Sequence, residues 1–133
     1  MGRQLVVVHA SSESEIDEAF STVVQQRAGA LIVASDIFLS TRINQLIALA
    51  SRHAIPTIYP WRDAVSAGGL IGYGIDLTGS YRQSGSYIGR ILQGAKPGEL
   101  PVLQLLAINL KTAKALGLNV PLIMQMTANE VIE

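Results

Sequence analysis

Apolar runs and amphipathic stretches alternate along this chain. Leu5–Val8 and Leu31–Val33 are continuous apolar runs, which is the pattern of strands covered on both faces of a parallel sheet. Between them, Ser12 and Glu15 have the spacing of a helix capping box. The apolar residues that follow recur at helical intervals and predict an amphipathic helix: Ile16, Ala19, Phe20, Val23 and Val24.

The alternation continues to the end of the chain. It predicts, in order, a helix capped by Ser40, a strand at Thr57–Tyr59, a short helical turn at Asp63–Ala67, a strand at Leu70–Tyr73, a helix ending near Leu92, a partly extended stretch at Val102–Leu110 and a helix at Lys111–Leu116. Strands that alternate with helices predict a parallel sheet with right-handed crossovers. We therefore expect one α/β domain over residues 1–133, a three-layer flavodoxin-like fold with helices on both faces, in which residues 102–133 form a tail of mixed pattern.

Composition excludes several function classes. Ten basic and ten acidic residues give a formal net charge of zero, and no cluster of Lys and Arg favours nucleic acid or an anionic membrane. The chain has no cysteine, so disulfides and thiolate metal sites are excluded. His9 and His53 are the only histidines, and neither belongs to a catalytic or metal-binding motif. We expect no enzyme activity, no cofactor and no metal.

The start of the chain and its apolar runs bear on location. Residues 1–4 lead directly into an apolar run and lack the pattern of a signal peptide. No apolar run approaches the roughly 18 residues that a membrane-spanning helix needs. As written, the chain is expected to be soluble and cytoplasmic.

Candidate ligand-binding residues follow the predicted strands, because open parallel sheets bind ligands beyond the carboxyl ends of their strands. The candidates are polar, aromatic or glycine residues at these ends: Ser35, Asp36, Tyr59, Trp61, Tyr73, Gly74 and Asp76. A carboxylate could accept a ligand's ammonium or hydroxyl group, an aromatic ring could stack on the ligand, and glycines expose backbone amides. Each also has an ordinary structural role: helix or turn capping for Asp36 and Asp76, and packing under a loop for Tyr59 and Trp61.

Several segments together resemble the ABC-transporter substrate-binding protein family related to tryptophan and tyrosine binders. They include G-G-L-I-G-Y-G-I-D at residues 68–76, Y-R-Q-S-G-S-Y-I-G-R-I-L-Q-G-A-K-P-G at residues 81–98 and I-N-L-K-T-A-K-A-L-G at residues 108–117. The resemblance implies the C-terminal lobe of a two-lobed type I periplasmic-binding fold, which traps its ligand by hinge closure. It implies a solute-binding component of an ABC importer, with an amino-acid-like ligand, an ABC permease as partner and a periplasmic location.

The sequence departs from this family in ways that leave other functions open. Set against the resemblance, we expect this sequence to lack the N-terminal lobe and the first strand and helix of the C-terminal lobe, and the stretch between Gln104 and Ile108 is shorter than the family's. We therefore expect an incomplete lobe. The alternative is a structural or interaction module that binds no small molecule; a regulator's sensor domain lacks support, since no helix-turn-helix precedes it. An uncovered apolar strand at Leu5–Val8 would favour pairing with another chain, so we expect a homo-oligomer, with residues 102–133 packing across lobes or exchanging between chains.

Overall fold

The computed structural model of this chain describes residues 2, 4–75, 77–102 and 104–133. Their strands form one sheet in the order β1-β2-β3-β4-β5. The strands are β1 (Leu31–Ile32), β2 (Thr57–Tyr59), β3 (Ile71–Gly74), β4 (Leu105–Asn109) and β5 (Glu130–Ile132). Every neighbouring pair is parallel except β3 and β4, which are antiparallel. The sheet is therefore mostly parallel, and the expected α/β class is confirmed.

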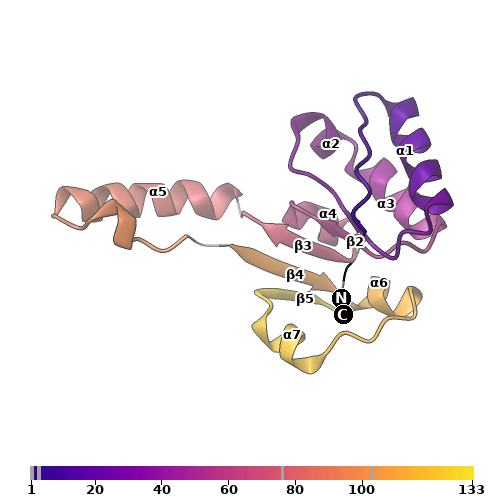
Figure 1. Cartoon of the computed structure of the whole chain (residues 1–133). Coiled ribbons are helices and arrows are strands. Elements are labelled where there is room, and N and C mark those ends of the chain that lie inside the picture. The colour runs from indigo at the N-terminus through magenta and orange to yellow at the C-terminus, as the bar shows by residue number, and fades with distance from the viewer. Residues whose placement is uncertain (1, 3, 76, 103) are drawn as a thin grey trace.

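Helices lie on both faces of this sheet, as Figure 1 shows. One face carries α1 (Glu13–Gln25), α2 (Ile37–Thr41), α3 (Ile43–Arg52) and α4 (Arg62–Ser66), while α6 (Leu110–Ala115) and α7 (Leu122–Thr127) belong to the other side of the molecule. The long helix α5 (Leu77–Leu92) extends away from the sheet, and a return segment with the short 3-10 helix η1 (Pro97–Glu99) leads back to β4.

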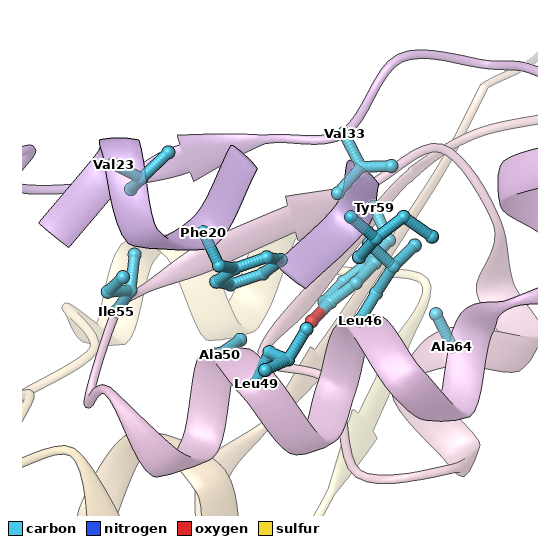
Figure 2. Close-up of a cluster of buried hydrophobic side chains, with 10 residues drawn as sticks. Phe20, Val23, Val33, Leu46, Leu49, Ala50, Ile55, Tyr59 and Ala64 are labelled. Carbon is cyan, nitrogen blue, oxygen red and sulfur yellow. The ribbon is translucent and has the colours of Figure 1, made fainter. Parts of the chain in front are cut away.

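The core lies between the first group of helices and the sheet. Figure 2 shows Phe20 and Val23 of α1 above Leu49 and Ala50 of α3, with the Tyr59 side chain at the centre of the cluster. The amphipathic stripe expected on α1 is confirmed, because Ile16, Phe20 and Val23 are its buried residues. The capping box is also present in modified form: the Ser12 hydroxyl accepts from the Glu15 amide, and the Glu15 carboxylate accepts from the Ser11 amide.

Two expected local features are wrong. Leu5–Val8 is extended but forms no strand, because no described residue pairs with its backbone, and its Leu5 and Val7 side chains are exposed. Ser40 lies inside α2 and donates its hydroxyl to the Ile37 carbonyl, so it does not cap the following helix. Arg42 precedes α3 without a side-chain cap.

The tail pairs with the sheet of its own chain. β4 aligns four residues with β3, from Ile71–Ile108 to Gly74–Leu105, and Ala107 and Ile108 are fully buried. Asn109 anchors the junction: its side chain donates to the Val65 carbonyl and accepts from the Thr112 amide. The tail therefore extends the sheet beyond β3 and does not cover the edge at β1.

Candidate ligand-binding site

The carboxyl ends of β1, β2 and β3 lie side by side, since these strands are parallel neighbours. The loop after β2 and the end of β3 are in direct contact. A methyl group added at Gly74 would collide with the Pro60 carbonyl, and one added at Gly72 would lie 3.1 Å from the Trp61 carbonyl oxygen. Glycine is thus required here by the close approach of two backbones. This brings the predicted loops together at one edge of the sheet.

Ser35 and Asp36 follow β1 and are both exposed. The Asp36 carboxylate accepts a hydrogen bond of 3.1 Å from the Leu39 amide and caps α2. The capping role considered from the sequence is therefore present. A carboxylate has several lone pairs, so one capping bond leaves acceptor capacity at the exposed loop.

Tyr59 and Trp61 differ in position, although they stand two residues apart. The Tyr59 side chain is 1% exposed and lies in the core, as Figure 2 shows, and burial raises its pKa to about 12. The Tyr59 ring is therefore a core residue, as the alternative of packing under a loop predicted, and its contact with a ligand stays a prediction. Trp61 is half-buried, immediately precedes α4 and packs against the edge of the core.

Tyr73 is the most accessible aromatic residue among the candidates. It is 52% exposed, and its hydroxyl donates to the side-chain oxygen of Gln104. This bond joins the end of β3, from which the chain continues into α5, to the segment through which the chain returns from α5 to β4. Gly74 lies at the end of β3. Asp76 lies outside the described residues.

The sequence analysis missed an apolar cavity beside these strand ends. It has a volume of about 410 Å³, and the residues that line it are Ile32, Val33, Ile58, Tyr59, Pro60, Ile71, Tyr73, Leu106 and, from α7, Met124. The sequence of strand β2 contained a signal for this cavity, because alternate residues of a strand point to opposite faces of the sheet. Tyr59 points into the core, so Ile58 must point to the other face.

Sequence reasoning also missed an ion pair at the first turn of α4. Two guanidinium nitrogens of Arg62 contact the Glu130 carboxylate of β5, at 2.6 and 3.0 Å. Such a two-point pair fixes the arginine geometrically. Arg62 therefore ties the β2 loop to the tail. In the part of the chain that the structure describes, no group of three or more His, Cys, Asp or Glu residues is placed to hold a metal ion.

A family model described as "ABC transporter substrate binding protein" matches residues 1–132. The chain belongs to this family. Its members are substrate-binding proteins and not enzymes, which agrees with the absence of a catalytic motif. A comparison with curated proteins found no match. Among the described residues, no helix combines the length and apolar character needed to cross a membrane.

Three solved structures are similar to this chain. A conserved domain protein of Vibrio cholerae has 21% identity and a TM-score of 0.71, and a ligand-free, open substrate-binding protein with adhesive properties from Clostridium difficile has 21% and 0.64. An ABC domain from Streptococcus pneumoniae in complex with L-Trp has 27% identity and a TM-score of 0.68. Between 91% and 93% of this chain is covered, against 42% of each of the other chains. The chain therefore spans less than half the length of these proteins.

Proposed function

We propose that this chain is part of the solute-binding component of an ABC importer and contributes one wall of a site for an amino-acid-like ligand. In this proposal the Asp36 carboxylate meets the ligand's ammonium group. Trp61 and Tyr73 flank the ligand, and the backbone around Gly74 offers hydrogen-bonding groups. Ser35 belongs to the same edge, and Asp76, which lies outside the described residues, stays among the proposed ligand contacts on its sequence position alone. An ABC permease is the proposed partner, and the proposed location is outside the cytoplasm.

The observation that carries this proposal is the contact between the loops that follow parallel strands. The Asp36 carboxylate is on one loop and the half-buried Trp61 on the next, while the exposed Tyr73, next to Gly74, lines an apolar cavity. Ligand pockets combine a mostly apolar lining with a few polar groups that fix orientation. The similar ABC domain solved with L-Trp supports an amino acid as the ligand class.

Thermal unfolding with added L-tryptophan, L-leucine or L-aspartate tests the proposal. A ligand that binds only the folded chain stabilises it by about 2.7 kcal/mol at a concentration of 100 Kd. We expect L-tryptophan to raise the melting temperature by several degrees, and L-aspartate to have no effect because the cavity is apolar. A response to none of the three amino acids would contradict the proposal.

The substitution Asp36→Asn isolates the carboxylate charge. Asparagine caps a helix as well as aspartate does, so the variant should keep its melting temperature without ligand. It should lose most of the increase that L-tryptophan produces. Glu99→Gln, in the distant return segment, is the matched control and should respond like the unsubstituted chain. An unchanged ligand response in Asp36→Asn would remove Asp36 from the site.

A further inference from the structure

The arginine directly after Trp61 joins the loop that follows β2 to the last strand of the sheet. The Arg62 Nε and Nη2 atoms donate to the two carboxylate oxygens of Glu130, at 2.6 and 3.0 Å. The two side chains are 43% and 29% exposed, and an ion pair this accessible contributes little to folding stability. Its two-point geometry, by contrast, fixes the direction of the arginine closely. The pair is therefore better suited to holding a position than to stabilising the fold.

A row of small residues across the sheet lies between Arg62 and Glu130. Gly72 of β3 is aligned with Ala107 of β4, and Ala107 is aligned with Glu130 of β5. Aligned residues of neighbouring strands project from the same face of a sheet. A methyl group added at Gly72 would lie 3.4 Å from the Arg62 Cα atom, so Arg62 begins directly above this row. Two strand spacings, about 10 Å, separate Gly72 from Glu130, and the arginine can cross them because only a hydrogen atom and a methyl group lie beneath it.

The tail also holds the other end of α4. The Asn109 side chain donates to the carbonyl of Val65, in the last turn of the helix, at 3.2 Å. The Thr112 hydroxyl donates to the carbonyl of Gly68, just beyond the helix, at 2.8 Å. The tail thus fixes α4 at both ends, and the ion pair is the contact at the end beside the candidate site.

Trp61 stands at the end of α4 that the ion pair holds. It is the residue immediately before the helix, and its side chain makes no capping hydrogen bond. The ring is half-buried and packs against the edge of the core. Its direction therefore depends on where the first turn of α4 is held.

We infer that Arg62 and Glu130 are positioning residues, which hold the first turn of α4 so that the Trp61 ring faces the ligand. The inference rests on the proposed function, in which Trp61 flanks an amino-acid-like ligand. It gives the last strand a part in binding, although no residue of β5 is among the candidate contacts. Because the pair acts through Trp61, its loss changes the affinity for ligand more than it changes the stability of the fold.

Trp61 is the only tryptophan of the chain, so its fluorescence reports the position of the loop without an added probe. Glu130→Ala removes the partner of the arginine. In the ligand-free chain we expect the acrylamide quenching constant of Trp61 to rise about twofold, because a ring that is no longer held samples more exposed rotamers. The melting temperature should fall by at most about 4 °C. Glu99→Ala removes the carboxylate of a different ion pair, with Lys96 in the distant return segment, and as the control should leave the quenching constant unchanged.

Calorimetric titration with L-tryptophan measures the consequence for binding. We expect the Kd of Glu130→Ala to be about fivefold higher than that of the unsubstituted chain, because the ring must then be ordered when the ligand binds. Glu99→Ala should bind like the unsubstituted chain. Raised quenching with an unchanged Kd overturns the inference. If L-tryptophan does not bind the unsubstituted chain, the proposed function fails, and the quenching constants still decide whether the pair positions Trp61.

An exchange of the two charges separates positioning from damage to the fold. Arg62→Glu and Glu130→Arg each place two like charges opposite one another, and each should raise both the quenching constant and the Kd. The double variant restores an arginine–carboxylate pair and should recover most of the original values of both. Damage to folding by either substitution would not be repaired by the second. Unchanged quenching in Glu130→Ala, or a double variant no better than the single ones, overturns the inference.

Discussion

Asn109 shows how one side chain joins the tail to the rest of the molecule. It is 6% exposed, caps α6 through the Thr112 amide and donates to the last-turn carbonyl of Val65 in α4. Asn109→Ala would remove the cap and leave a buried carbonyl without that partner. We expect a loss of about 2 kcal/mol in the free energy of unfolding, measured by urea denaturation. Asn119→Ala, an exposed loop position, should change it by less than about 0.5 kcal/mol.

Gly74 lies where two backbones are too close for a side chain. The Cβ of an alanine at this position would overlap the Pro60 carbonyl, which belongs to a loop held by β2 and α4. Gly74→Ala should therefore cost about 3 kcal/mol of stability. Gly29→Ala is the matched control, because nothing lies within 4 Å of its added methyl group. Equal stability of the two variants in thermal unfolding would contradict the close contact.

Tyr59 makes stability depend on pH at the alkaline end. Its pKa rises to about 12 in the folded chain because the phenol is buried, whereas an unfolded tyrosine has a pKa near 10. The folded state therefore holds the proton more tightly. This contribution, roughly 2–3 kcal/mol, is complete below about pH 10 and is lost as the pH rises through about 12. Between these limits Tyr59→Phe should lose less stability than the unsubstituted chain, as urea denaturation at each pH would show.

Among the helices, α5 lies farthest from the sheet (Figure 1). It has 16 residues and extends away from the sheet, and isolated helices of about this length are marginal in water. Its backbone amides should exchange with solvent faster than those of α1. Gly85→Ala should slow exchange across residues 77–92, since alanine favours a helix by about 1 kcal/mol over glycine. Exchange should be measured by mass spectrometry on dilute chain, and α1 is the internal reference that should not change.

At the scale of the whole molecule, the tail completes the sheet. Ala107, Ile108 and Ala113 are almost fully buried, and β4 pairs with β3 along four residues. A chain ending at Leu100 would lose these contacts and expose one side of β3. We expect it to lose cooperative thermal unfolding, measured by circular dichroism. Removal of Glu133 alone, an exposed residue outside β5, should leave the transition unchanged.

The sequence by itself determined most of the local elements. The 3.6-residue period of α1, the β-branched strand at Thr57–Tyr59 and the end of helix α6 just before Gly117 depend on nearest neighbours and on burial of one face, which a pattern records directly. The positions of the loops after β1, β2 and β3 followed from the same pattern. They were predictable because parallel strands place their carboxyl ends at one edge.

Only the tertiary structure decided pairing and orientation. Leu5–Val8 has a strand's composition, yet a strand exists only where a neighbouring backbone pairs with it, and pairing is not local. β4 is antiparallel to β3, and this orientation depends on the direction in which the chain returns from α5. Tyr59 and Trp61 look alike in the sequence, but Tyr59 ends β2 and is buried in the core, whereas Trp61 lies beyond the strand, directly before α4, and is half-buried. The sheet lies between α3 and the cavity. The Tyr59 side chain packs in the core on one face of β2, and Ile58 faces the cavity on the other.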